Sequence, residues 1–473
     1  MSSILIRGGT VITADTRYEA DLVVEGETIA RVERESKADA DLIIDAAGKL
    51  VLPGAVDPHT HLDSHYEGLT TCDDFHSGTI AAACGGTTCI VDFCIQYRGV
   101  ELWEALETWQ TKLETNPPVI DVGFHMAVSD LSVPNADEDL RRLCEAGVTS
   151  FKLFLAYKES IQVDDETMFR VMQAAAEHGA LVLIHAENGD AIDVLIRDAL
   201  ATGKTDSAWH ARTRPPLTEA EATSRALYLG HVAGAPVYIV HMSCEEALGR
   251  LAAARRRGWR AWGETCTQYL YVDETFLDGP RSEAAKFVFT PPPRAQEEQA
   301  NLWRALENGL LSVVSSDHCP YFLTDKTAGD DFSTIPQGAP GIEERLVLLH
   351  DGGVRSGRIS MSGLVELVST NPARLFGLYP RKGTIAVGSD ADLVVFDPDR
   401  RHVISARNHH SKVDYSLYEG REVVGAPDIV VARGRVIVEN GDPVAKPGFG
   451  EFVSRDRFST SAAHDFRSKT SRN

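Results

Sequence analysis

Hydrophobic and polar positions alternate in short runs near both ends of the chain. Close to the N-terminus the runs are SILIRGGTVIT, ADLVVEGETIARV and DLIIDAAGKLV, and close to the C-terminus they are GSDADLVVFDP, HVISA and DIVVARGRVIVENG. A period of two, interrupted by Gly and Asp turns, is typical of antiparallel strands. The pattern predicts one small β-sandwich domain built from both chain ends, residues 1–52 and 379–447.

The middle of the chain alternates apolar strands with segments of helical spacing. The eight apolar runs are LVLPGAVD, TTCIVDF, VIDVGFHM, TSFKLFL, ALVLIHAE, PVYIVHMS, WRAWGETC and LLSVVSSD. Strands joined by helical crossovers predict an α/β fold with a closed (β/α)8 TIM-type barrel over residues 53–378, whose active-site residues follow the C-terminal strand ends. The remaining residues, 448–473, are polar and charged, and they predict a loose C-terminal tail or arm.

Composition narrows the classes of partner. The chain has 473 residues and 43% hydrophobic content, enough for a sizeable core, and a formal net charge of −22. Nucleic acids and anionic membranes both attract basic surfaces, so the charge argues against either partner. We therefore expect a small-molecule ligand, with no nucleic acid and no membrane.

The N-terminal stretch MSSILIRGGTVITADT lacks the apolar centre of a signal peptide, and no apolar run reaches the membrane-spanning length of about 18 residues. These features predict a cytoplasmic protein. None of the eight cysteines forms a CxxC pair, so we expect reduced thiols in the core rather than disulfides or a thiolate zinc site.

Metal-ligand residue types cluster at the predicted strand ends. His59 and His61 end the first strand, His185 the fifth, His241 the sixth and Asp317 the eighth. One strand-end histidine is more often a hydrogen-bonded core residue than a ligand, but five ligand-type residues on four strands favour a metal site. Neutral imidazoles are good ligands for first-row metals.

Lys152 lies in the middle of the predicted fourth strand, TSFKLFLAYK. A buried ammonium needs compensation, either from a core aspartate or by losing its charge. Reaction of the neutral amine with carbon dioxide gives a carbamate whose two oxygens can bridge two metal ions. On that hypothesis one divalent ion is held by His59, His61, Lys152 and Asp317, and a second by Lys152, His185 and His241.

Several motifs carry a resemblance to a known family. They include VLPGAVDPHTHLD, GVTSFKLFLAYK, LVLIHAENGD, PVYIVHMSCEEAL, KFVFTPPPR, VSSDHCPY and DFSTIPQGAPGIEER. From about residue 4 to 450 the sequence resembles the hydantoinase/dihydropyrimidinase family of cyclic amidohydrolases. The resemblance implies a binuclear centre, usually zinc, with N6-carboxylysine at Lys152, hydrolytic opening of a cyclic ureide or imide, and a homo-oligomer, either a dimer or a tetramer.

The resemblance also implies roles for single residues. Asp317 would take a proton from the attacking water and return it to the leaving nitrogen. Tyr157 matches a tyrosine that donates a hydrogen bond to the developing oxyanion. Thr290 and Gln337 match the segments that bind the amide edge of the substrate ring.

Two departures from the family pattern concern the substrate. Gln337 stands where we expect asparagine, and Ser64, His65 and Tyr66 form a loop that is commonly more apolar in hydantoinases. We expect this loop to contact the exocyclic substituent of the ring. The departures predict a substituent that is less apolar, or differently sized, than the large groups many hydantoinases prefer.

Three functions are compatible with this pattern. The main one is ring opening of cyclic ureides or imides, with hydantoins as the first substrate and dihydropyrimidines as the second. An allantoinase-like ring opening and a non-catalytic scaffold related to dihydropyrimidinases are the other two. The complete set of ligand-type residues argues against the scaffold.

Overall fold

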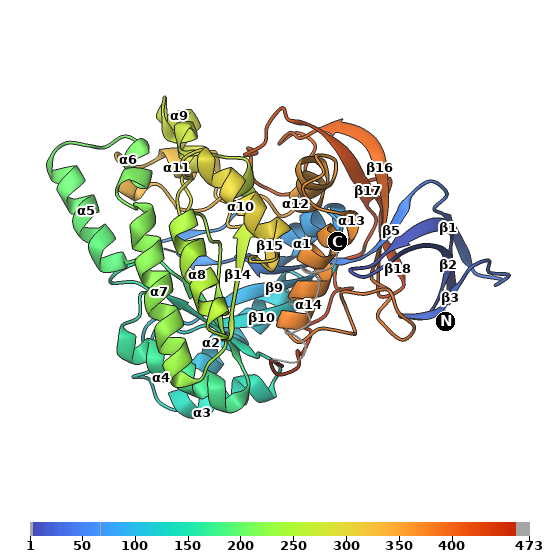
Figure 1. The fold of residues 1–473 in the computed structure, drawn as a ribbon, viewed down its shortest axis with the longest axis horizontal. Coiled ribbons are helices and arrows are strands. Elements are labelled where there is room, and N and C mark those ends of the chain that lie inside the picture. Colours follow the sequence, from blue (N-terminus) through green and yellow to red (C-terminus); the bar gives the residue numbers. More distant parts are fainter. Residues whose placement is uncertain (1–2, 67, 460–473) are drawn as a thin grey trace.

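The computed structural model describes residues 3–66 and 68–459, and its larger part is a barrel of parallel strands (Figure 1). Along the sheet the strands run β15-β14-β13-β12-β11-β10-β9-β6. Their bounds are β6 (Ala55–Thr60), β9 (Thr87–Ile95), β10 (Asp121–Ala127), β11 (Ser150–Phe154), β12 (Leu181–His185), β13 (Val237–Ile239), β14 (Ala261–Cys266) and β15 (Val313–Ser315). Every residue of these strands is buried, as expected for parallel strands covered by helices. The predicted barrel is confirmed.

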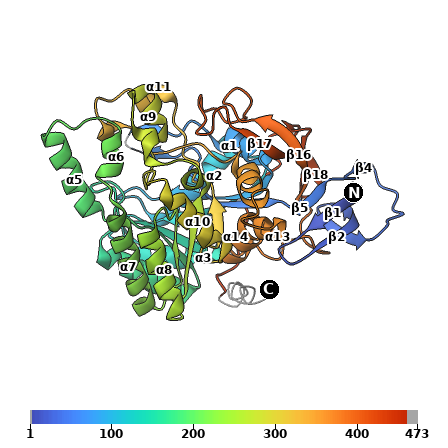
Figure 2. The same ribbon diagram turned by 45° about the horizontal axis from the view of Figure 1, so that its top comes forward.

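Helices follow the strands and cover the outside of the barrel (Figures 1 and 2). The longer ones are α1 (Phe75–Cys84), α2 (Leu102–Thr115), α3 (Ala136–Glu145), α4 (Asp165–His178), α5 (Gly189–Ala201), α7 (Pro216–Ala233), α8 (Glu245–Arg256) and α10 (Glu297–Glu307). The short ones are α6 (Ala208–Arg212), α9 (Arg281–Ala284), α11 (Leu323–Thr327), α12 (Arg345–Leu349), α13 (Met361–Val365) and α14 (Asn371–Leu375). Local sequence sets their ends: Asp74 and Asp164 cap the amide groups of α1 and α4, and Gly179 ends α4 with φ of 74°.

The barrel closes between its first and last strands. A parallel bridge joins Thr60 to His318 just beyond β15. Below it the buried guanidinium of Arg345 donates to the carbonyl oxygens of Val56 and Val314, at 3.1 and 3.0 Å. One side chain thus satisfies a carbonyl on each of the two closing strands, which keeps the ligand-bearing ends of β6 and β15 together.

The second domain is a sheet in which the two chain ends lie side by side, in blue and red in Figure 1. Its strands are β1 (Ser3–Ile12), β2 (Arg17–Glu25), β3 (Thr28–Glu33), β4 (Leu42–Asp45), β5 (Leu50–Pro53), β16 (Leu393–Val403), β17 (Glu422–Ala432), β18 (Arg435–Glu439) and β19 (Asp442–Pro443). β5 pairs with β1 on one side and β16 on the other, so it joins the two halves. Their alternate apolar residues, among them Ile6, Leu22 and Val395, form a separate core.

The run LVLPGAVD is shared between the domains. Leu50–Pro53 belongs to the sheet and Ala55–Thr60 to the barrel. Gly54 separates them, and a Cβ at this position would lie 2.1 Å from the hydroxyl oxygen of Thr88. The close approach explains a glycine at the crossing.

The C-terminal segment packs against the barrel over its described part. Val122 donates to the carbonyl of Glu451 and accepts from the amide of Val453, at 2.9 and 2.8 Å, so the segment forms a parallel bridge beside the beginning of β10. Arg455 is only 3% exposed. Residues 448–459 therefore form a packed arm rather than a loose tail, the two forms that were predicted, and residues 460–473 lie outside the described part.

Two further expectations can be compared with the fold. All eight cysteines are free thiols and seven of them are buried, as predicted. Across the described residues, no helix is long and apolar enough to cross a membrane.

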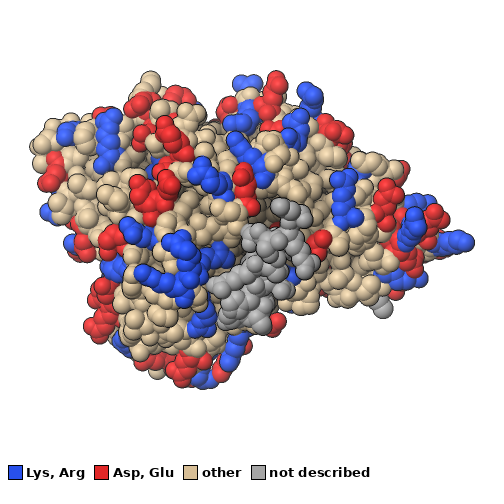
Figure 3. All heavy atoms as spheres, viewed as in Figure 1, with Lys and Arg blue, Asp and Glu red and all other residues tan. Residues whose placement is uncertain are grey.

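The face drawn in Figure 3 carries both acidic and basic side chains.

Candidate metal centre and active site

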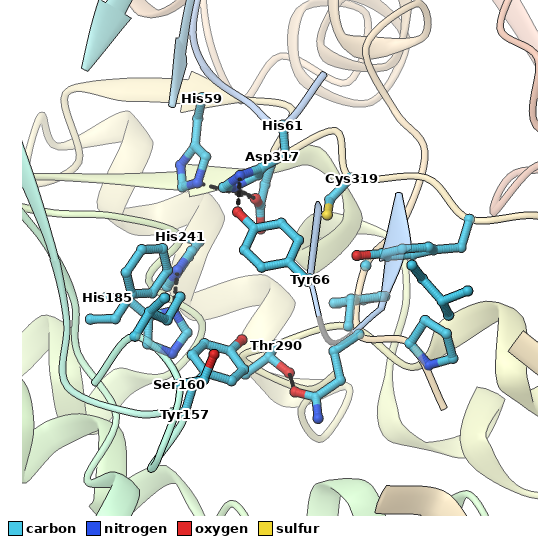
Figure 4. A pocket seen from close by; sticks show the side chains of 18 of the residues that line it. His59, His61, Tyr66, Tyr157, Ser160, His185, His241, Thr290, Asp317 and Cys319 are labelled. Carbon is cyan, nitrogen blue, oxygen red and sulfur yellow. Dashed lines mark hydrogen bonds and ion pairs between the residues drawn. The ribbon is translucent and has the colours of Figure 1, made fainter. Parts of the chain in front are cut away.

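The predicted ligands meet at the C-terminal mouth of the barrel (Figure 4). Nε2 of His59 lies 3.1 Å from Oδ1 of Asp317, and Nε2 of His61 lies 3.3 Å from the same oxygen. On the other side, Nδ1 of His185 lies 2.8 Å from Nε2 of His241. Ligand atoms of His59, His241 and Asp317 all lie within 4.8 Å of one another. The structure brings together all five residues that the strand-end pattern singled out.

Lys152 projects from β11 among these groups and is fully buried. Within the described chain its Nζ has no hydrogen-bond partner, and it lies over the rings of Phe93 and Phe154, at 4.7 and 4.9 Å from their centroids. No aspartate among residues 3–66 and 68–459 pairs with it, which argues against a lysine in a core ion pair. Burial lowers the pKa of Lys152 to about 8, which makes the neutral, nucleophilic amine accessible.

The protonation states of the cluster suit metal ligation. Burial lowers the pKa of His61 to about 4 and that of His241 well below its usual value, so both rings are neutral near pH 7. Burial alone would raise the pKa of Asp317, but His59 and His61 hold it well below its ordinary value. Burial also disfavours a charge on His59, but Asp317 holds the pKa of His59 above its usual value. The neutral rings of His61 and His241 and the ionised Asp317, around an unpartnered buried amine, fit a site for divalent cations.

Two carboxylate partners of the ligand histidines were not found from the sequence. Nδ1 of His59 lies 2.5 Å from Oε1 of Glu264, and Nε2 of His185 lies 3.1 Å from Oε2 of Glu187. Both glutamates are completely buried. Such carboxylates fix the tautomer and orientation of a ligand imidazole. A glutamate within the buried strand AWGETC was the available signal.

His61 has a different partner, the hydroxyl of Tyr66, 2.9 Å from its Nδ1. Tyr66 lies in β7 (His65–Tyr66), which forms a two-residue hairpin with β8 (Leu69–Thr70) beside the site. Its ring faces the metal-ligand cluster in Figure 4. The sequence singled out Tyr66 for substrate contact but not for this bond.

A pocket opens directly above the cluster. It is lined by the six predicted ligands and by Tyr66, Leu69, Phe154, Tyr157, Ser160, Ile161, Phe289, Thr290, Cys319, Tyr321, Thr334, Pro336, Gln337 and Gly338. Burial raises the pKa of Tyr157, so its hydroxyl keeps its proton and can donate it in a hydrogen bond. Its ring centroid lies 5.2 Å from that of His185.

Thr290 and Gln337 lie together at the far wall of the pocket. The Thr290 hydroxyl donates to Oε1 of Gln337 at 2.6 Å, and Arg214 donates to the same oxygen at 3.2 Å. Ser64 and His65 do not line the pocket: Ser64 is buried behind it and His65 is exposed. Of the loop predicted to contact the substituent, only Tyr66 faces the pocket.

Barrel, sheet domain and convergent ligands together define the class of protein. The sequence model described as "Amidohydrolase family" matches residues 50–437, and the chain belongs to that family.

Its relatives place it more narrowly, in the hydantoinase/dihydropyrimidinase group of cyclic amidohydrolases. A D-hydantoinase of Geobacillus stearothermophilus is 49% identical over 456 residues, 96% of this chain and 97% of that protein. A dihydropyrimidinase of Rattus norvegicus is 40% identical, covering 96% of this chain and 89% of the relative. The crystal structure of a dihydropyrimidinase from Brevibacillus agri superposes with a TM-score of 0.95 at 47% identity, covering 97% of this chain and 99% of that one.

Proposed function

We propose that this chain hydrolyses a cyclic amide bond of hydantoins, with dihydropyrimidines as the second substrate class, at two divalent ions bridged by N6-carboxylysine at Lys152. The observation that carries the proposal is the buried, unpartnered Nζ of Lys152 among four histidines and Asp317. His59, His61, Lys152 and Asp317 would hold one ion, and Lys152, His185 and His241 the other. Zinc is the proposed metal, since it accepts imidazole and carboxylate ligands without a strict geometry.

When bound, the ions supply an activated water and polarise the carbonyl that is attacked. The chain's own groups handle the proton and the substrate. Asp317 accepts the proton of the attacking water and passes it to the leaving ring nitrogen. Tyr157 donates its hydroxyl proton in a hydrogen bond to the carbonyl oxygen as negative charge develops there. The segments at Thr290 and Gln337 bind the amide edge of the ring.

The remaining proposals concern the oligomeric state, the location and the alternative functions. A homo-oligomer, dimer or tetramer, and a cytoplasmic location accord with the family resemblance. Allantoinase-like ring opening is the alternative reaction. A non-catalytic scaffold would have no use for the complete ligand set or for the carboxylates that orient it.

Two measurements test the proposal. Hydantoin, 5-substituted hydantoins, dihydrouracil and allantoin should be assayed for ring opening, and we expect turnover of the hydantoins first. Metal analysis and native mass spectrometry should give two ions per chain and the added mass of one carbon dioxide. Lys152→Ala should lose nearly all activity and regain part of it with added short carboxylates, whereas Lys158→Ala, a surface control paired with Asp190 at 2.9 Å, should behave as wild type. One ion or none in active enzyme, or an unmodified Lys152, would contradict the proposed centre.

A further inference from the structure

Lys326 is a completely buried lysine that the proposed chemistry does not use. It lies on the short helix α11, and its Nζ donates three hydrogen bonds to backbone carbonyls: to Val288 at 2.8 Å, Pro336 at 2.9 Å and Gly338 at 2.6 Å. Three carbonyl acceptors require three N–H donors, which only the ammonium form of lysine has. Every donor of the side chain is therefore used, and all three go to main chain.

The three carbonyls belong to two segments that are distant in sequence. Val288 precedes Phe289 and Thr290, and the carbonyls of Pro336 and Gly338 flank Gln337 on both sides. The segments also bond directly, because the amide of Gly338 donates to the carbonyl of Val288 at 3.1 Å and the Thr290 hydroxyl donates to Gln337. Lys326 thus crosslinks, through hydrogen bonds, the two segments that form the far wall of the pocket.

Burial of this ammonium is costly. Burial lowers the pKa of Lys326 to about 7, and among the described residues no carboxylate forms an ion pair with it. An apolar side chain would fill the same volume without the cost of burying a charge. Replacing buried charged groups by apolar residues of similar size is often neutral or stabilising. The cost is explained if the side chain fixes a geometry that apolar packing would leave loose.

We propose that Lys326 is a positioning residue that holds the segments 288–290 and 336–338 at the spacing required to grip the amide edge of the substrate ring. The inference rests on the proposed function, because it assigns these segments to the ring. Lys326 does not touch the substrate; it acts through the carbonyls on either side of Gln337 and before Phe289. A loosened wall would let the ring shift relative to the metal centre, and shifts of about 1 Å cost up to about 100-fold in rate.

The test compares Lys326→Met, which keeps the length of the side chain but removes all donors, with Lys326→Gln, which keeps a donor group, and Lys326→Arg, which keeps the charge. Lys286→Met is the matched control, since Lys286 lies nearby in η3 (Ala285–Phe287) and forms an ion pair with Glu283 at 2.7 Å instead of bonding to the pocket wall. Steady-state kinetics should be measured on whichever cyclic amide the wild type opens, with metal content and thermal unfolding of each protein. For Lys326→Met we expect KM to rise at least tenfold with two metal ions retained, Lys326→Gln and Lys326→Arg to recover part of the loss, and the control to match wild type.

The possible failures are distinguishable. A wild type that opens no cyclic amide would overturn the proposed function and this inference with it. An active wild type whose Lys326→Met variant has unchanged KM, or loses activity only in proportion to its folded or metal-loaded fraction, would overturn the positioning role alone. Failure of the Met, Gln and Arg variants to fold would assign Lys326 to folding and would also overturn it.

Discussion

Asp317 is the central carboxylate of the site, since both His59 and His61 direct Nε2 toward its Oδ1. It follows β15 with φ of 50°, a left-handed conformation that is uncommon for a non-glycine residue. Tyr157 and His241 have positive φ as well, at 70° and 38°. Such conformations are retained at functional sites because the surrounding structure determines them, and here they occur just past the strand ends.

Replacement of Asp317 by asparagine should impair turnover far more than folding. Asparagine keeps the shape but cannot accept a proton, so kcat should fall by on the order of 10²–10⁴. Kinetics with parallel metal analysis and thermal unfolding check this expectation. A variant that keeps its metal and near-normal turnover would remove Asp317 from proton transfer.

Tyr157→Phe removes a hydroxyl while the ring still packs beside His185. If that hydroxyl donates to the oxyanion, kcat should fall by roughly 10²–10³ while the unfolding free energy stays nearly constant. Single-turnover kinetics would separate this loss from weaker binding. An unchanged rate would mean that Tyr157 only packs.

At the scale of elements, the hairpin of β7 and β8 lines the pocket with Tyr66 and Leu69 and directs His65 to solvent. We predict that Tyr66→Leu alone changes the preference among methyl-, carboxymethyl-, phenyl- and hydroxyphenyl-substituted hydantoins. A change in pocket size and polarity of this kind should shift relative kcat/KM by roughly 10-fold or more, toward large apolar groups. His65→Ala is the control and should keep the wild-type ranking. The same ranking in both variants would mean that Tyr66 does not set specificity.

The C-terminal segment supplies another element-level prediction. Arg455 donates to the hydroxyl of Ser150 at 2.8 Å and to the carbonyl of Phe124, and Ser150 in turn lies 2.6 Å from Nδ1 of His125. Arg455→Met would leave buried acceptors without a donor, which should lower the unfolding free energy by about 1–3 kcal/mol. Urea unfolding measures the loss, with exposed Arg457→Met as the control. Equal stability of the two variants would show that the segment adds little.

At the scale of the whole molecule, the centre joins residues from several barrel strands: His59 lies in β6 with His61 just after it, Lys152 in β11 and His185 in β12. Ions that bind only the folded chain stabilise it by RT ln(1 + [L]/Kd), about 2.7 kcal/mol when the free ion is 100 times Kd. Removing metal with a chelator should therefore lower the unfolding temperature, and adding zinc should restore it. The shift should be much smaller in Lys152→Ala. Identical unfolding with and without chelator would contradict a metal centre of this kind.

Much of this architecture could be predicted from the sequence. Parallel strands buried on both faces have continuous apolar sequences, so all eight barrel strands could be predicted. The residues at their C-terminal ends indicated the candidate ligands His59, His61, His185, His241 and Asp317. Lys152 stood out because an ammonium in such a run demands an explanation. These features are local in the chain. The periodicity of hydrophobic residues, or a charged residue within an apolar run, can be recognised without knowing any tertiary contact.

Other features were decided only by the tertiary structure. Glu264 meets His59 from 205 residues away, and Lys326 meets carbonyls of two separate segments. The sequence placed Ser64 and His65 at the pocket, where the fold does not place them, and it left open whether residues 448–459 form an arm or a loose tail. These positions depend on which polar groups of distant segments pair with one another in the folded chain. That pairing is set by the closure of the barrel, and no local pattern of hydrophobic and polar residues encodes it.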